Sequence, residues 1–203
     1  MSQKPTNRYA LATGVEAETE PGSRGRVLRN RLGRTRKRTI EAMEYDALLR
    51  AQERFTEEIA ADTRFTAGHF CRMHHAWLGG IYEWAGHYRT VELAKDDFRW
   101  PPAAFVAQNM AVFENGLLHQ HTPCPPGPLP EVARRIAEVH AELLLIHPFR
   151  EGNGRLARWL ADLMALQAGL STPKYRLSGR GSSRDAHGIW RPLRQVIFPA
   201  TML

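Results

Sequence analysis

Apolar side chains recur every three or four residues along most of the chain, which is the spacing of one face of an α-helix. This period predicts a first long helix from about residue 35 or 38 to residue 61. A second helix should begin after Thr66, a good N-cap, and end at Gly79-Gly80. Further helices are predicted, by residue number, over about 101–118, on each side of 147–155, and over about 182–197.

Residues 87–99 break the helical period. Aromatic and β-branched residues flank a polar turn at residues 95–97, a pattern that indicates two short strands in a hairpin. The predicted fold class is therefore mainly α, a helical bundle with one short β-hairpin. Residues 1–20 are polar and without a period, so they are interpreted as a flexible N-terminal lead. Residues 21–203 are expected to form a single domain.

Composition and cysteine content narrow the class of protein. The 203 residues are 43% hydrophobic, enough for one domain with a sizeable core. No apolar run approaches the ~18–20 residues of a membrane span, and the N-terminus lacks the apolar segment of a secretory signal. Cys71 and Cys124 make no disulfide framework. We therefore expect no membrane association and a cytoplasmic location, or a host cell's cytosol if a specialised system secretes the protein.

The net charge of +7 is concentrated near the N-terminus. Residues 24–38, termed the basic arm, hold eight arginines or lysines and no acidic residue. A solvated arm that leads into the first helix is one interpretation. An electrostatic footprint for an acidic or DNA-bound partner is the other, and the sequence leaves both open. No aromatic residue interrupts the run, so base stacking is not indicated.

Residues 147–158 read His-Pro-Phe-Arg-Glu-Gly-Asn-Gly-Arg-Leu-Ala-Arg and join two of the predicted helices. A loop that enters a helix N-terminus presents unpaired N–H groups and a partial positive charge, and so favours an anion. Gly152 and Gly154 permit the positive φ angles and close backbone approach that a phosphate needs. Arg155 and Arg158, three residues apart, share one face of the helix and can reach the same polyphosphate.

Two further residues of this loop carry chemistry. His147 suits the role of a general base, since an imidazole that is neutral near pH 7 can accept a proton. Glu151 suits Mg²⁺, which takes one or two carboxylates in addition to phosphate oxygens. A buried structural histidine and a solvated carboxylate are the alternatives. The loop as a whole predicts a nucleotide-phosphate site.

These twelve residues resemble the signature of the Fic family, His-x-Phe-x-(Asp/Glu)-Gly-Asn-Gly-Arg-x-x-Arg, at every defining position. Residues 27–33 are similar to the family's leader, and residues 81–91 to the segment that enters its flap. The likeness covers roughly residues 21–197. Most Fic proteins are adenylyltransferases that transfer AMP from ATP to a hydroxyl side chain of another protein.

The resemblance implies a Fic fold, in which the flap hairpin, at about residues 87–99, lies next to a catalytic loop at 147–155. It implies His147 as the catalytic base, Glu151 as the Mg²⁺ ligand, and ATP as the substrate. The residues implied to bind the nucleotide's phosphates are Gly152, Asn153, Gly154, Arg155 and Arg158. The residues implied to form the flap edge are Val91, Glu92, Leu93 and Ala94. An exposed strand edge can align an extended target segment by main-chain pairing.

Many Fic proteins carry an inhibitory helix, (Ser/Thr)-x-x-x-Glu-(Gly/Asn), whose glutamate pairs with the second arginine of the signature. No Ser or Thr in this sequence is followed four residues later by Glu; after Thr39, for example, that position is Met43. The sequence therefore resembles the toxins that a small antitoxin protein inhibits in trans. Topoisomerase subunits would be targets by analogy only.

Other functions stay open at this stage. On the same fold, the chain could be a phosphotransferase, or another nucleotidyl or phosphocholine transferase. From a different class, it could be a non-catalytic nucleotide-sensing or DNA-associated binding module, for which the basic arm is the favourable feature. The intact Gly-Asn-Gly-Arg sequence at residues 152–155 argues against the phosphotransferase, and the complete string at 147–158 argues against the binding module.

Overall fold

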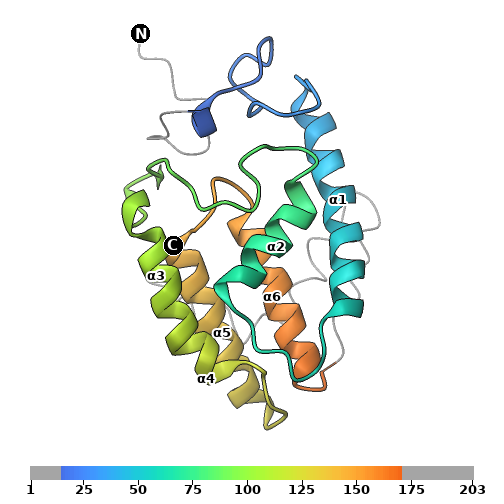
Figure 1. The fold of residues 1–203 in the computed structure, drawn as a ribbon, viewed down its shortest axis with the longest axis vertical. Coiled ribbons are helices and arrows are strands. Elements are labelled where there is room, and N and C mark those ends of the chain that lie inside the picture. Colours follow the sequence, from blue (N-terminus) through green and yellow to red (C-terminus); the bar gives the residue numbers. More distant parts are fainter. Residues whose placement is uncertain (1–14, 171–203) are drawn as a thin grey trace.

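The computed structural model describes residues 15–170, and the helix predicted over residues 182–197 lies outside them. The fold is mainly α with one short hairpin, as predicted (Figure 1). The α-helices are α1 (Lys37–Glu58), α2 (Ala67–Leu78), α3 (Val106–Phe113), α4 (His119–His121), α5 (Leu129–Ile146) and α6 (Asn153–Gln167). Short 3₁₀ turns occupy Val15–Ala17 and Ala103–Phe105, and a π-helical turn spans Glu114–Leu118. The strands are β1 (Ala94–Lys95) and β2 (Phe98–Arg99).

Local sequence explains several of the helix ends. The Thr66 hydroxyl accepts the N–H of His69, while the His69 ring accepts the N–H of Thr66, which completes a reciprocal cap at the start of α2. Pro128 precedes α5 and Pro130 lies in its first turn, where a missing N–H costs nothing. The prediction of Thr66 as an N-cap is confirmed.

One hydrophobic core joins the helices. Phe55 of α1 meets Trp159 of α6 edge to face, with ring centroids 5.4 Å apart. Phe70 of α2 stacks on Phe113 of α3 at 6.0 Å. The long helices run roughly along the longest axis of the molecule, and α5 packs against α6 (Figure 1). The loop between α5 and α6 consequently lies at one end of this bundle.

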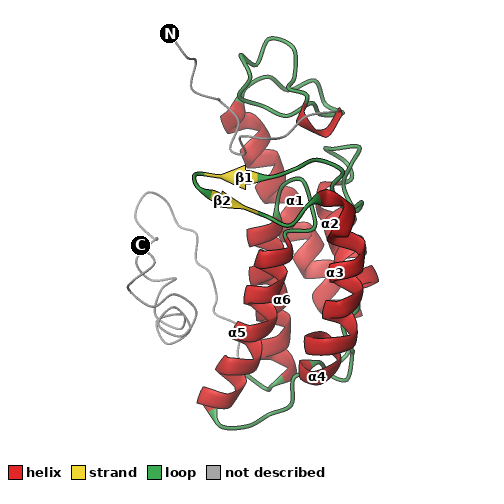
Figure 2. Cartoon of the chain, turned by 90° about the vertical axis from the view of Figure 1, so that its left-hand side faces the viewer, coloured by secondary structure: helices red, strands yellow, loops and turns green. Residues whose placement is uncertain are grey.

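The N-terminal segment, residues 15–36, lies at that same end (Figures 1 and 2). Residues 1–20 were predicted to be a flexible lead, but residues 15–20 are held by specific contacts. Thr19 forms an isolated β-bridge with Leu28. The Glu16 carboxylate accepts the N–H and the hydroxyl of Thr90, and the Glu16 carbonyl accepts the Arg150 guanidinium. A search for local periods does not show the contacts of Glu16, because Thr90 and Arg150 lie 74 and 134 positions away along the chain.

The hairpin is shorter than the sequence pattern indicated. Ala94 pairs with Arg99, and Lys95 with Phe98, around a turn in which Asp96 has a φ of 53°. Residues 87–93 form no strand. Over residues 90–93, the apolar Val91 and Leu93 are buried and the polar Thr90 and Glu92 are exposed, so this alternation reflects burial on one side without a partner strand. Among residues 15–170, no helix is long and apolar enough to cross a membrane.

Candidate active site

His147 occupies the C-terminal cap of α5. Its backbone is left-handed, with φ 53° and ψ 60°, and its N–H donates to the Leu143 carbonyl at 3.0 Å. The ring lies against Trp100, with centroids 4.1 Å apart. Nδ1 is 3.1 Å from the Leu144 carbonyl, and since a carbonyl only accepts, Nδ1 carries the hydrogen. The tautomer is therefore fixed with Nε2 as the basic nitrogen.

A buried amide closes the loop that follows. The Asn153 side chain accepts the Phe149 N–H at 2.9 Å and donates to the Phe149 carbonyl at 2.7 Å. Asn153 was expected to orient phosphate oxygens, yet its side chain is buried and turned into the loop. Its amide completes the hydrogen bonds of a tight turn. The backbone N–H of Asn153, at the start of α6, is the group that can contact an anion.

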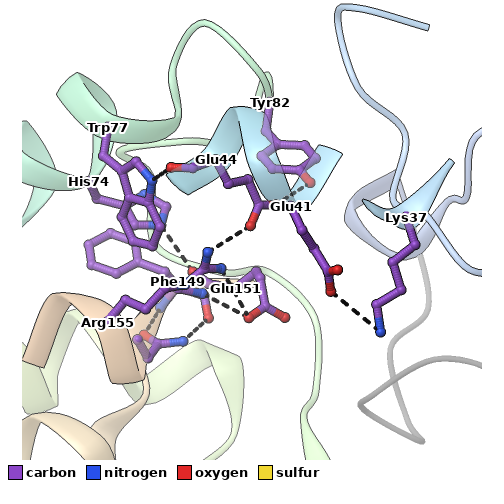
Figure 3. Close-up of polar contacts among 11 residues, drawn as sticks. Lys37, Glu41, Glu44, His74, Trp77, Tyr82, Phe149, Glu151 and Arg155 are labelled. Atoms are coloured by element: carbon purple, nitrogen blue, oxygen red, sulfur yellow. Dashed lines mark hydrogen bonds and ion pairs between the residues drawn. The ribbon is translucent and has the colours of Figure 1, made fainter. Parts of the chain in front are cut away.

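A second buried residue supports this loop from α2. His74 stacks on Phe149 with centroids 4.0 Å apart and planes 7° apart (Figure 3). Its Nδ1 accepts the Gly86 N–H at 2.9 Å, so its Nε2 donates to the Glu151 carbonyl at 3.0 Å. Burial lowers the pKa of His74 to about 4. The ring is thus neutral at physiological pH, and its two hydrogen bonds hold the loop at Glu151 against the segment at Gly86.

The N-terminus of α6 has the geometry of an anion site. Gly152 caps the helix with φ 87°, a conformation that side chains disfavour. A Cβ at Gly152 would lie 2.8 Å from the Trp77 ring, so glycine is required by packing as well. Beside Gly154, in contrast, no heavy atom lies within 4 Å of a Cβ position. The N–H groups of residues 153 and 154 belong to the first turn of α6, where no preceding helical carbonyl can accept them.

Arg155 is held on α6 by contacts from three sides (Figure 3). Its guanidinium lies over the Trp77 ring at 4.5 Å, and Nη1 donates to Glu44 Oε2 at 2.7 Å. Nη2 is 3.8 Å from Glu151 Oε1. Arg158 is exposed on α6, and its charge contributes to lowering the pKa of His140 on α5, after burial. That the two arginines converge on one polyphosphate stays a prediction.

Glu151 lies between the loop and Arg155. Its Oε1 accepts the Gly152 N–H at 3.1 Å, and its side chain is 16% exposed. Within residues 15–170, no cluster of three or more His, Cys, Asp or Glu side chains could hold a metal by itself. This donor set fits Mg²⁺ bound by one carboxylate together with phosphate oxygens and water.

A charged cavity of about 280 Å³ opens beside these groups. Its lining includes Arg26, Lys37, Glu41, Glu44, Glu151 and Arg155, so the basic arm and α1 share it with the loop. A larger cavity, of about 690 Å³, lies between α1 and α2, and its lining includes none of the candidate catalytic, nucleotide-binding or metal-binding residues. The smaller cavity is the one that belongs to the site.

The flap residues are placed as follows. Val91 and Leu93 are buried, Glu92 is exposed, and Ala94 is the only one of the four in a strand. The Glu92 carboxylate accepts the Ala103 N–H at 3.0 Å. Strand pairing of a target along this edge stays a prediction, and the two-residue strand gives it a short template.

A buried arginine connects the flap to His147. Arg89 is 2% exposed, and Nε donates to the His147 carbonyl at 2.8 Å. Its two terminal nitrogens donate to the carbonyls of Val91 at 2.9 Å and Pro101 at 2.6 Å, one on each side of the hairpin. Arg89 thus connects both ends of the flap to the backbone of His147.

Sequence reasoning missed several residues of this site, among them Glu44, His74, Trp77, Arg89 and Trp100. For Glu44 a signal existed. The residues buried on α1 are Ile40, Glu44, Leu48, Ala51 and Phe55, so a carboxylate interrupts an otherwise apolar stripe. A charged residue at such a position is rarely left without a partner.

Comparisons with known proteins give the site its context. The family model described as the Fic/DOC family matches residues 64–165. A relative from Salmonella typhimurium, "Probable protein adenylyltransferase Fic", is 27% identical over 178 residues, which cover 83% of this chain and 78% of the relative. The "Protein adenylyltransferase VbhT" of Bartonella schoenbuchensis is 31% identical over 107 residues, covering 52% of this chain and 22% of that protein.

Solved structures show the same fold. The BepC protein of Bartonella tribocorum, a VirB-translocated effector determined with bound AMPPNP, has a TM-score of 0.63 at 18% identity. The match covers 84% of this chain and 90% of that one. The Fic domain of Bep8 from Bartonella sp. 1-1C gives a TM-score of 0.66 at 15% identity, covering 85% of this chain and 89% of that one.

Proposed function

Because the chain belongs to the Fic/DOC family, we propose that it is a protein adenylyltransferase that transfers AMP from Mg-ATP to a Ser, Thr or Tyr hydroxyl of a target protein. The observation that carries the proposal is the place of His147: it ends α5, its Nδ1 contacts the Leu144 carbonyl, and the loop that follows it leads into the N-terminus of α6. The curated relatives named as protein adenylyltransferases support the same activity.

In the proposed reaction, the target's hydroxyl oxygen attacks the α-phosphorus of ATP. Nε2 of His147 accepts the hydroxyl proton, the bond between the α-phosphorus and the bridging oxygen breaks, and pyrophosphate leaves. The Leu144 carbonyl keeps the imidazole in the tautomer that this step needs. Trp100 packs on the ring and limits its rotation.

The phosphates would be held by the helix N-terminus and by cations. The first-turn N–H groups of residues 153 and 154 suit an oxyanion, and Arg155 and Arg158 would neutralise further charge. Glu151 would hold Mg²⁺, which supplies charge neutralisation to the polyphosphate when bound. As in phosphoryl transfer generally, catalysis would come chiefly from positioning and charge stabilisation.

A labelling experiment separates this reaction from its alternatives. The purified chain is incubated with Mg²⁺, a cell lysate, and ATP labelled at either the α or the γ position. The proposal expects protein labelling from the α position only. Labelling only from the γ position would indicate a phosphotransferase, and no labelling at all would indicate a binding module.

We further propose that a small antitoxin protein inhibits the chain in trans, since the sequence lacks the inhibitory pattern. A glutamate of that partner would pair with Arg158, which is exposed on α6. The target and its acceptor hydroxyl would dock along the flap edge, with topoisomerase subunits as candidates by analogy alone. All eight cationic residues of the basic arm are exposed, which suits an acidic or DNA-bound partner.

A further inference from the structure

Glu44 is the one carboxylate among the buried polar and charged residues of positions 15–170. It lies in the first half of α1, 111 positions before Arg155 in the sequence, and its side chain is 8% exposed. Both of its oxygens are occupied: Oε1 accepts the Tyr82 hydroxyl at 2.6 Å and Oε2 accepts Arg155 at 2.7 Å. A charge buried this deeply is costly unless it is paired, so the pairing determines where Arg155 points.

The surroundings of Glu44 keep it fixed. Its own carbonyl accepts the Trp77 indole N–H at 2.8 Å, and that same indole lies under the Arg155 guanidinium. Burial, and then the charge of Glu44, raise the pKa of the Tyr82 hydroxyl well above its usual range, so Tyr82 remains a donor. One side chain and one carbonyl of Glu44 thus connect α1, α2 and α6 around a single guanidinium (Figure 3).

This arrangement orients the remaining donors of Arg155. With Nη1 on Glu44 and one face of the guanidinium on Trp77, Nη2 is directed towards Glu151 at 3.8 Å. The edge of Arg155 that stays available therefore points to the carboxylate proposed to bind Mg²⁺, and hence to the polyphosphate. An arginine fixed before the nucleotide arrives loses less conformational entropy on binding.

We infer that Glu44 is the positioning residue of the nucleotide site: its buried carboxylate holds Arg155 in the orientation that binds the phosphates of ATP. The inference rests on the proposed function. Glu44 is distinct from an inhibitory glutamate in two respects. It contacts Arg155 and not Arg158. It is also a buried residue of a 22-residue helix, whereas an inhibitory glutamate has to move away when ATP binds.

The two roles predict opposite changes in ATP affinity, which makes the inference testable. A positioning carboxylate, once removed, weakens ATP binding, whereas removal of an inhibitory carboxylate strengthens it. The full 203-residue chain is titrated calorimetrically with Mg²⁺ and the non-hydrolysable analogue AMPPNP. Glu44→Ala should weaken binding roughly 10–100-fold, by analogy with the loss of affinity when the hydrogen-bond partner of a metal ligand is removed. Glu53→Ala is the matched control, an exposed glutamate of α1 that does not line this cavity, and should bind as the wild type does.

Two further variants separate positioning from folding. Glu44→Gln can still accept from Arg155 and can donate its amide to the Tyr82 oxygen, so it should restore most of the affinity lost in Glu44→Ala. In an Arg155→Ala background, Glu44→Ala should cause no further loss, because the two residues act as a unit. A purely structural role would instead lower the affinity equally in both backgrounds.

Three outcomes would overturn the inference. Binding by Glu44→Ala equal to or tighter than wild type is one, and equal losses with and without Arg155 is another. If Glu44→Ala does not fold, Tyr82→Phe takes its place, since it removes the hydroxyl that fixes Glu44 and leaves the ring; unchanged AMPPNP affinity in that variant is the third. A wild-type chain that binds no AMPPNP would contradict the proposed function itself, which keeps the two failures distinguishable.

Discussion

At the scale of single residues, the site depends on backbone conformations that the sequence indicates only through its glycines. Gly152 was recognised as a residue that permits positive φ, and its φ of 87° agrees. The left-handed backbone of His147 carries no such signal, because a histidine rarely adopts φ 53°. Strain of this kind persists where surrounding contacts over-determine it, and it concentrates at functional sites.

The first residue-scale prediction concerns His147. We expect His147→Ala to lower the rate of AMP transfer by about 10²–10⁴-fold, the contribution of a general base. ATP affinity should stay within a few-fold of wild type, because the base acts on the attacking hydroxyl and not on the ground-state phosphates. Transfer is measured with α-labelled ATP, and binding by calorimetry. Wild-type turnover in this variant would remove His147 from the mechanism.

A second prediction compares two glycines two positions apart. Gly152→Ala should destabilise the fold by about 2–4 kcal/mol, since it combines a left-handed backbone with a Cβ 2.8 Å from the Trp77 ring. Gly154→Ala is the control: it lies within α6 with open space around it and should stabilise the fold by about 0.5–1 kcal/mol. Urea unfolding of both variants measures the difference. Equal effects would show that the Trp77 contact does not constrain the loop.

At the scale of elements, local patterns predicted the helices well and the long-range connections poorly. The cap at Thr66 and the apolar faces flanking the loop depend on neighbours three or four residues apart, so the sequence displays them directly. Glu41 and Glu44 are the same residue type on one helix, yet one is exposed and the other buried. Their difference arises from Tyr82 and Arg155, which no local period connects to α1.

The same limit applies to the hairpin. The pattern over residues 87–99 indicated two strands, but only residues 94–95 and 98–99 pair. The preceding residues are shaped by Arg89, whose three hydrogen bonds to carbonyls replace a strand partner. An arginine in a polar-looking segment is usually interpreted as exposed, so its burial could be found only from the packed structure.

Arg89 gives the element-scale prediction. Arg89→Lys should destabilise the fold by about 3 kcal/mol, because the lysine ammonium cannot donate to all three carbonyls that the planar guanidinium of Arg89 reaches at once. AMP transfer should fall as well, since the His147 carbonyl is one of the three, while AMPPNP affinity is retained. Arg99→Lys, on the exposed strand β2, is the control and should change stability by no more than about 0.5 kcal/mol. Comparable stability of the two variants would contradict the connection between flap and base.

At the scale of the whole molecule, the loop, the hairpin, the N-terminal segment and the first half of α1 meet at one end of the helical bundle (Figures 1 and 2). The charged cavity at that end mixes residues of the basic arm, such as Arg26, with Glu151 and Arg155. A partner that binds there would contact the arm and the nucleotide site at once. A regulatory partner bound at this end could therefore use the basic arm as part of its binding surface.

The last prediction follows from that location and from the missing inhibitory pattern. The chain should be active as purified, and strong expression of it alone should arrest growth, whereas expression of His147→Ala should not. A small partner bearing a glutamate on a helix should suppress both effects by forming a charge-assisted pair with Arg158. Replacing that glutamate by glycine should restore activity without abolishing the complex, because apolar packing would supply most of the interface. Glu44 does not interfere with this test, since its partner is Arg155 and its position in α1 is fixed. The prediction is wrong if the folded 203-residue chain is inert with Mg-ATP and a complete lysate, or if its strong expression leaves growth unchanged.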